Sequence, residues 1–150
     1  MSASTVNPAY AGRVYPPAEV YEVSREQIRA FAVGIDSPDP AHRDPEAARA
    51  LGYADVVAPP TFAVILAQRT EGQYIDDPEA GVDFSRVVHG EERFTHHRPI
   101  VAGDRLIPTL HIDIARVTGG HGMITTRVEI ADEAGLPVST VISTIVVRGE

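Results

Sequence analysis

The segment from Pro60 to Tyr74, PTFAVILAQRTEGQY, contains an unbroken apolar run from Phe62 to Ala67. In a helix, such a run places apolar side chains on nearly all sides of the first turns. A helix on a protein surface has one apolar stripe, whereas a helix that is apolar all round is enclosed by other structure. The sequence therefore predicts a helix beginning at Pro60 that the rest of the chain surrounds.

The second half of the chain shows the period of two that is typical of β-strands. Leu110, Ile112 and Ile114 alternate with polar residues, and TGGHG (118–122) and DEAG (132–135) provide turn residues. The expected sheet is an antiparallel meander of about four strands that follows the helices. The predicted strands cover residues 86–97, 106–114, 124–130 and 138–147, and an early segment at 15–21 could add an edge.

A buried helix and an antiparallel sheet within 150 residues favour an α+β fold with a single domain over residues 1–150. The arrangement predicted is a hot-dog domain, in which an antiparallel sheet wraps around a long buried helix. The alternative is an α+β sandwich with two helices on one face of the sheet.

Two shorter helices are predicted before the buried one. Ser24 and Gln27 have the spacing of a capping box at the start of the first. Asp44 and Pro45 are typical of the N-cap and first position of the second. The intervening stretch, IDSPDPAH (35–42), is acidic and rich in proline, which prevents a regular helix there.

The composition excludes several classes of function. The chain has no Cys, and all 13 basic residues are Arg, so thiolate catalysis and lysine Schiff bases are excluded. The net charge of −8 without a dense Arg cluster argues against nucleic-acid binding. No apolar stretch is long enough to span a membrane, and the N-terminus does not resemble a secretory signal, so we expect a cytoplasmic protein. No nucleotide motif occurs, and no cofactor is predicted.

The loop between the two short helices contains candidate catalytic residues, Asp36, Asp39 and His42. A carboxylate can orient water, and an imidazole can exchange a proton near neutral pH. The alternative is that the aspartates cap turns and the histidine bonds to the backbone. His96 and His97 are adjacent in a predicted strand, so they point to opposite faces and no metal site is predicted.

Four stretches give the chain a family resemblance over nearly its whole length: VSREQIRAFAVGI, DPAHRDPEAARALGY, VVAPPTF and FTHHRPIVAGDRL. The chain resembles the MaoC-like hydratase/dehydratases, and most closely their N-terminal MaoC-like, or FAS1-like dehydratase, branch. That branch includes subunits of mycobacterial 3-hydroxyacyl-thioester dehydratases. The resemblance implies reversible water addition to a trans-2-enoyl thioester of coenzyme A or acyl carrier protein, giving the (R)-3-hydroxy compound. It also implies a homodimer, or a heterodimer with a second hot-dog chain.

The family's catalytic pair of aspartate and histidine is only partly matched in this sequence. An ungapped alignment places His42 on the family's histidine, but it places Ser37 on the family's aspartate. The nearest preceding carboxylate, Asp36, lies one residue early, and a one-residue shift near a helix end rotates a side chain by about 100°. Asp39 occupies the position of the family's asparagine.

The segment expected to bind the substrate also departs from the family pattern. It comprises Ala58, Pro59, Pro60, Thr61 and Phe62. Pro59 and Pro60 stand where active members have His-Gly, whose glycine amide helps to stabilise the enolate oxygen. Proline has no backbone N–H, so that donor is lost, and only the next amide, that of Thr61, could partly replace it.

Three functional hypotheses follow from the resemblance and its departures. The chain could be an (R)-specific enoyl-thioester hydratase, with His42 as the acid/base and Asp36 or Asp39 as the carboxylate. It could instead be a non-catalytic subunit that binds the acyl chain beside a catalytic hot-dog partner. A hot-dog thioesterase is a further alternative.

Arg98 either meets a phosphate group at the rim of the site or belongs to a solvated turn.

Overall fold

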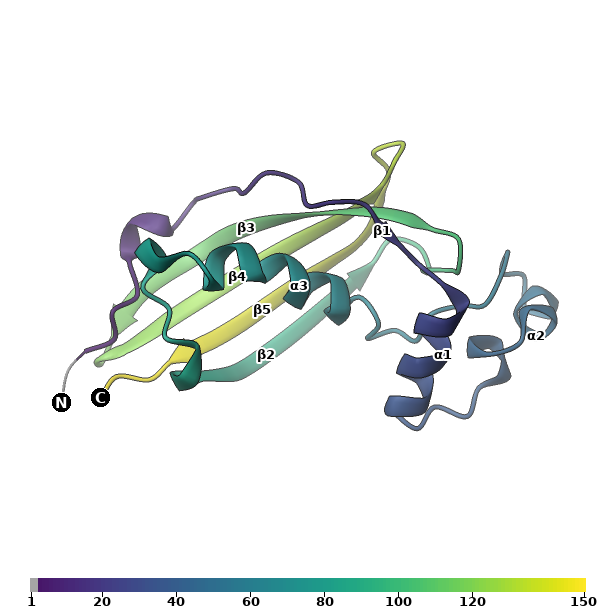
Figure 1. The fold of residues 1–150 in the computed structure, drawn as a ribbon, viewed down its shortest axis with the longest axis horizontal. Helices are drawn as coiled ribbons and strands as arrows, with labels where there is room; N and C mark the ends of the chain where they lie inside the picture. The colour runs from purple at the N-terminus through teal and green to yellow at the C-terminus, as the bar shows by residue number, and fades with distance from the viewer. Residues whose placement is uncertain (1–2) are drawn as a thin grey trace.

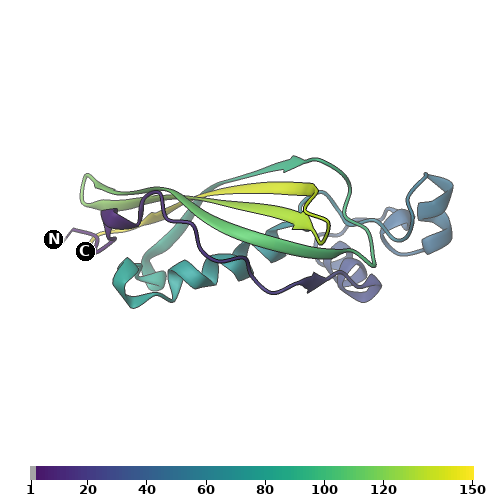
Figure 2. The ribbon, with the colours of Figure 1, turned by 90° about the horizontal axis from the view of Figure 1, so that it is seen from above.

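Helix α3 (Val64–Ile75) lies across one face of a five-stranded antiparallel sheet in the computed structural model, which describes residues 3–150 (Figure 1). Viewed from above, the sheet and α3 form two layers, and the helices α1 and α2 lie beyond one end of the sheet (Figure 2). The long helix packed on an antiparallel sheet is therefore as predicted. The expectation that the rest of the chain surrounds the helix is wrong, because Gln68 and Arg69 on its outer face are exposed. The alternative with two helices on one sheet face does not occur, because only α3 covers that face (Figure 1).

The regular elements follow the predicted order, helices before most of the strands. The strands are β1 (Tyr21–Glu22), β2 (Val87–His96), β3 (Arg105–Thr118), β4 (His121–Asp132) and β5 (Pro137–Val147). The helices are α1 (Arg25–Gly34), α2 (Pro45–Ala50) and α3, with 3₁₀ turns η1 (Pro8–Tyr10), η2 (Pro40–His42), η3 (Pro78–Ala80) and η4 (Phe84–Arg86).

The strand order in the sheet is β1-β3-β4-β5-β2. Strands β3, β4 and β5 form the predicted meander, and the glycine-rich turn after β3 places Gly119 and Gly120 at positive φ. β2 precedes β3 in the chain but pairs with β5, so the meander does not extend to the first long strand. β1 and β2 are therefore the two edges of the sheet.

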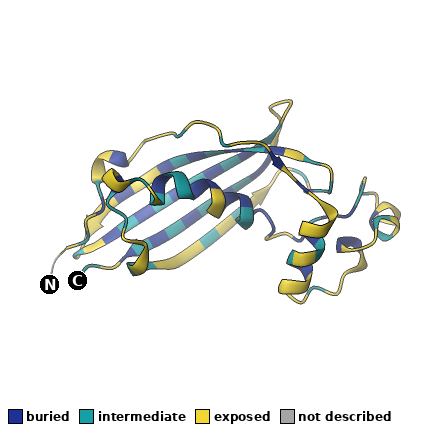
Figure 3. Ribbon diagram, viewed as in Figure 1, coloured by how far each residue is buried: buried dark blue, intermediate teal, exposed yellow. Residues whose placement is uncertain are grey.

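The core lies between α3 and the inner face of the sheet (Figure 3). The α3 side chains buried against the sheet share one helical stripe: Leu66, Ala67, Thr70, Glu71 and Tyr74. On the opposing strands, Leu110 and Ile112 are fully buried. Truncating a core leucine of this kind typically costs about 2–5 kcal/mol of stability. One member of the helical stripe, Glu71, is a carboxylic acid, which such a core rarely accommodates.

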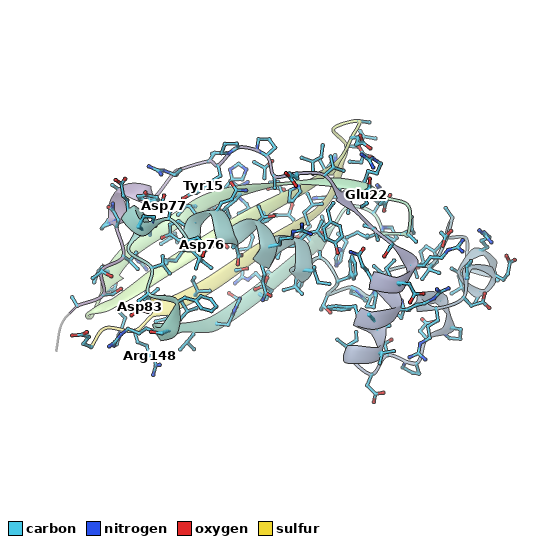
Figure 4. The ribbon with its side chains drawn as sticks, viewed as in Figure 1. Tyr15, Glu22, Asp76, Asp77, Asp83 and Arg148 are labelled. Carbon is cyan, nitrogen blue, oxygen red and sulfur yellow. The ribbon has the colours of Figure 1, made fainter. Side chains whose placement is uncertain are left out.

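The N-terminal segment is fastened to the far end of α3. The Tyr10 hydroxyl donates a 2.7 Å hydrogen bond to the Asp77 carboxylate, directly beyond the C-terminus of that helix. Tyr15 lies in the same region of the molecule (Figure 4).

Two elements differ from prediction. The early strand is limited to Tyr21–Glu22, because Pro16 and Pro17 cannot donate to a β-ladder.

The second difference is the start of α3, which begins at Val64 instead of Pro60. Residues 60–63 form turns, in which the carbonyl of Pro59 accepts from the amide of Phe62. The apolar run therefore starts before the helix does. None of the helices within residues 3–150 is long and apolar enough to cross a membrane.

The two short helices have the predicted caps. The Ser24 hydroxyl accepts from the Gln27 amide at 3.1 Å, and the Gln27 side chain accepts from the Ser24 amide at 2.9 Å. The Asp44 carboxylate accepts from the amide of Glu46 at the start of α2. These caps determine where α1 and α2 begin, and the cap of α2 marks the end of the loop between the two helices.

Candidate functional site

A cavity of about 500 Å³ lies between the α1–α2 region and the segment that follows β2. Both walls are built from loops, which is where rigid scaffolds commonly carry functional residues. The residues that line it are Asp39, Ala41, His42, Leu51, Tyr53, Val57, Ala58, Pro59, Pro60, His96, His97, Arg98, Pro99 and Ile100.

His42 is the buried titratable group of this cavity, with 8% of its surface exposed. It lies at the end of η2, and its Nδ1 is 2.7 Å from the carbonyl oxygen of Val57. A carbonyl can only accept, so Nδ1 carries a proton and Nε2 is the basic nitrogen of the neutral ring. Val57 is itself held by the hydrogen bond from its amide to the Ala41 carbonyl and by a bridge to Val101. The backbone therefore fixes both the tautomer and the orientation of His42.

The structure brings Asp39 and His42 to the same cavity, but not Asp36. Asp39 is the N-cap of η2, where its carboxylate accepts from the Ala41 amide at 3.0 Å. Asp36 is exposed and has a φ of 55°, a left-handed conformation that non-glycine residues seldom adopt. The backbone turns there to leave α1, and Asp36 is not among the residues that line the cavity. Of the two predicted aspartates, Asp39 lines the cavity, and its carboxylate also caps a turn, which was the alternative role predicted for it.

The segment expected to bind substrate divides into two parts. Ala58, Pro59 and Pro60 line the cavity, whereas Thr61 and Phe62 do not. Within residues 3–150 the amide of Thr61 has no hydrogen-bond partner, so it is an available donor just beyond the cavity wall. Phe62 is fully buried.

Phe62 packs edge-on against the ring of Phe31, with 5.5 Å between the ring centres. Such a contact adds to the burial of both rings. Phe62 is therefore a core residue that joins α1 to the start of α3.

Sequence reasoning missed the wall formed by residues 96–100 and the ring of Tyr53. The two histidines diverge as expected for neighbours in a strand: His96 contacts Ser139 and His97 contacts Thr140, on opposite faces of β5. Both still reach the cavity, because β2 ends at its mouth. The stretch FTHHRPIVAGDRL, which is part of the family resemblance, was the available signal.

Arg98 is held by the protein itself. Its guanidinium donates two hydrogen bonds to Asp104, at 2.9 and 3.1 Å, and a third to the Pro99 carbonyl. The Asp104 carboxylate raises the pKa of Arg98. Arg98 lies in the cavity lining, as the predicted rim position requires, while its guanidinium is engaged by carboxylate and carbonyl oxygens. Contact with a phosphate group stays a prediction.

The comparisons with known proteins agree with this geometry. The FAS1-like, dehydratase domain region matches residues 9–141. A UPF0336 protein of Saccharopolyspora erythraea is 52% identical over 141 residues, which cover 94% of this chain and 90% of that protein. A chain of the HadBC (3R-hydroxyacyl-ACP dehydratase) complex of Mycobacterium tuberculosis has a TM-score of 0.82 at 31% identity, covering 91% of this chain and 96% of that chain. A solved MaoC-like dehydratase has a TM-score of 0.85 at 34% identity, and the match covers 94% of this chain and 43% of that chain.

These similarities confirm the predicted hot-dog fold and the predicted family. The family match covers both walls of the cavity, from the loop after α1 to the segment after β2. The chain belongs to the family of FAS1-like, MaoC-like dehydratase domains.

Proposed function

We propose that this chain is a subunit of an (R)-specific 3-hydroxyacyl-thioester dehydratase, and that its cavity holds the acyl thioester. The observation that carries the proposal is the cavity itself, whose lining includes the fixed ring of His42 and the Asp39 carboxylate. An imidazole and a carboxylate at one cavity suit the addition or removal of water. The reaction consumes no cofactor, because water and the enoyl double bond exchange only a proton and a hydroxyl.

The same cavity lacks parts that a self-sufficient catalyst would use. Pro59 and Pro60 line it without a backbone N–H to offer to an enolate oxygen. Losing one such donor typically costs about 2.7–4 kcal/mol of transition-state stabilisation. Asp36, one of the predicted carboxylates, lies outside the cavity lining. These features favour a substrate-binding subunit whose partner completes the chemistry.

The free edge of the sheet supports a paired arrangement. β2 runs for ten residues and pairs on one side only within residues 3–150. A long edge strand presents unpaired N–H and C=O groups to another strand. The HadBC chain to which this chain is similar belongs to a complex. We propose that a second hot-dog chain pairs with this one, either a copy of it or a chain that carries the catalytic pair.

One observation favours a second candidate function, hydration by this chain alone. Nε2 of His42 is the basic nitrogen, and the Asp39 carboxylate lines the same cavity. In this candidate His42 exchanges the α-proton, Asp39 orients water, and the Thr61 amide substitutes for the missing donor. Turnover by the isolated chain separates the two candidates.

The test measures loss of enoyl absorbance with trans-2-enoyl thioesters of coenzyme A and of acyl carrier protein. The reactions contain the chain alone, a hot-dog chain bearing the family's Asp and His alone, and the two co-expressed. We expect the pair to exceed the partner alone by at least about 10-fold for long acyl chains, because the cavity adds binding energy. Release of free thiol would instead identify a thioesterase.

A variant that fills the cavity, Ala58→Phe, should abolish the gain from pairing, whereas Ala134→Phe in the exposed turn between β4 and β5 should not. Calorimetric titration of the chain with a non-reactive acyl thioester gives the binding directly. If the chain neither binds the thioester nor changes the partner's rate, the proposed function is wrong.

A further inference from the structure

A chain of polar side chains runs from the buried middle of α3 to the partly exposed free edge of the sheet, apart from the candidate site. Its members are Glu71 on α3, Thr126 on β4, Ser143 on β5, and Glu92 and His89 on β2. We call it the Glu71 network. Glu71 is 3% exposed, and Thr126 and Ser143 are also buried. Burying an ionised carboxylate without a cation is costly, so the network requires an explanation.

The hydrogen bonds of the network lead from one member to the next. Thr126 donates to a carboxylate oxygen of Glu71 at 2.8 Å. Ser143 donates to a carboxylate oxygen of Glu92 at 2.9 Å, and the other oxygen of Glu92 is 2.9 Å from Nε2 of His89. The strand register places Ser143 directly opposite both Thr126 and Glu92. The Ser143 hydroxyl also lowers the pKa of Glu71. The Ser143 hydroxyl therefore stands between two carboxylates.

A hydroxyl has one proton to donate. If both carboxylates were ionised, Ser143 could satisfy only one of them, and the other would face an oxygen lone pair. A proton on Glu71 removes the conflict. One Glu71 oxygen then still accepts from Thr126, its O–H donates to Ser143, and Ser143 donates to Glu92.

The charges around Glu71 point the same way. The charged groups that act on it are the Glu92 carboxylate and the His89 imidazole, both on β2. β4 and β5 present the uncharged hydroxyls of Thr126 and Ser143, and β3 presents apolar side chains. Burial raises the pKa of Glu71 most, and the Glu92 carboxylate raises it further. The hydrogen-bonding hydroxyls and the His89 imidazole act in the opposite direction, and the pKa remains raised.

We propose that Glu71 is protonated in the folded chain and that this proton joins the edge strand β2 to helix α3, so that its loss loosens β2. A looser β2 would also affect the candidate cavity, because β2 ends in His96, which lines that cavity. A looser β2 would also change the free edge of the sheet, with which another chain would pair. The inference concerns the chain itself and does not depend on its reaction.

Hydrogen–deuterium exchange of the full chain tests the proposal. The β2 amides, corrected for the intrinsic effect of pH on exchange, should lose protection several-fold between about pH 5 and pH 8, the range above an ordinary glutamate pKa. In Glu71→Gln, which cannot ionise, the protection should stay constant with pH. An unchanged pH dependence in Glu71→Gln would overturn the proposal.

Two matched variants identify the group responsible. Glu91→Gln changes an exposed carboxylate of the same strand that pairs with Arg93, and it should keep the pH dependence of the unmodified chain. His89→Gln removes the imidazole that contacts Glu92, and the loosening should persist. If the dependence vanishes in His89→Gln and persists in Glu71→Gln, the histidine is responsible and the proposal fails.

A second measurement needs no substitution. The carboxyl carbon of Glu71 can be followed by NMR in the unmodified chain while the pH is changed. We expect a midpoint well above the usual value of about 4.3 for glutamate. A midpoint at or below that value would overturn the proposal, even if Glu71→Gln failed to fold.

Discussion

The Nδ1 nitrogen of His42 lies 2.7 Å from the carbonyl oxygen of Val57. This bond joins the end of η2 to the segment before α3, two elements that meet only at the candidate cavity. It holds the imidazole through one nitrogen and leaves the other available, the arrangement that acid/base histidines require. The same bond also satisfies a carbonyl in a buried segment, so it has a structural role that can be measured separately.

The first prediction concerns this structural role. His42→Asn retains a side-chain N–H near Nδ1 and should change the free energy of unfolding by less than about 1 kcal/mol. His42→Leu leaves the Val57 carbonyl without a donor and should cost about 1–3 kcal/mol. Urea unfolding of the two variants measures the difference. Equal stabilities would show that the hydrogen bond to Val57 contributes nothing.

The second prediction concerns the Arg98–Asp104 pair. Asp104 is well shielded from solvent, and it also accepts from the amide of Val101. Arg98→Ala should therefore cost about 1.5–3 kcal/mol, because a charged hydrogen-bond acceptor loses both guanidinium donors. Arg93→Ala is the matched control. Its exposed pair with Glu91 should contribute less than about 1 kcal/mol in the same denaturation experiment. Similar costs for the two variants would refute a special role for Arg98.

Much of the fold was predictable because local signals were strong and agreed with one another. The capping box of Ser24 and Gln27 marked the start of α1, and the turn residues after β3 marked a hairpin. The start of α3 was not predictable, because apolar residues occupy buried turns as readily as a buried helix. Phe62 shows this: it precedes the helix and is nevertheless fully buried.

The candidate site was predictable only in part. His42 and Asp39 were identified because they share a short loop with a family pattern. Asp36 was ambiguous, because one residue at a helix end decides which way a side chain points. The wall at His96 comes from a strand distant in sequence, and no local period reports such a contact. Glu71 was missed because its position in the stripe of α3 matters only once the sheet covers that stripe.

The third prediction is the pH dependence of stability that Glu71 causes. Burial raises the pKa of Glu71 in the folded state above its unfolded value. Below the unfolded pKa the group is neutral in both states and costs nothing. As the pH rises towards the folded pKa, only the unfolded chain loses the proton, so the folded state is progressively destabilised.

Glu71→Gln should therefore be more stable than the unmodified chain at about pH 8, and the difference should shrink towards about pH 4. Urea unfolding across this range measures it. A stability difference that grew as the pH fell would mean that the folded state prefers the ionised carboxylate.

The fourth prediction compares two tyrosines that lie near each other, with ring centres 5.9 Å apart. The hydroxyl of Tyr74 is buried and has no hydrogen-bond partner within residues 3–150, and burial raises its pKa to about 12. Tyr74→Phe removes an unsatisfied polar group and should be neutral or stabilise the chain by up to about 1 kcal/mol.

Tyr10→Phe is the matched change in the same cluster. It removes the donor to Asp77 and should cost about 1.5–3 kcal/mol. Thermal unfolding at neutral pH distinguishes the two. Destabilisation by Tyr74→Phe as large as that by Tyr10→Phe would indicate that a bound water serves the Tyr74 hydroxyl.

The fifth prediction concerns the missing amide at the cavity. Pro60→Gly introduces a backbone N–H into the lining of the cavity that also contains His42. The family resemblance implies a glycine at this position. If the absence of this donor limits the chemistry, the variant chain should hydrate a trans-2-enoyl thioester at least about 10-fold faster than the unmodified chain, since one such donor is typically worth about 10²–10³ in rate. Loss of enoyl absorbance measures the rate.

Two further variants decide whether the gain is catalytic. Adding His42→Asn to Pro60→Gly should remove it, because the amide only stabilises a charge that the imidazole helps to create. Pro59→Ala adds an amide one residue earlier and should leave the rate unchanged, because the resemblance implies the donor at position 60. If the higher rate of Pro60→Gly persists without His42, the cause is loop flexibility and not the new amide. No gain from Pro60→Gly would mean that more than one donor is missing, and the chain would then depend on its partner for the chemistry.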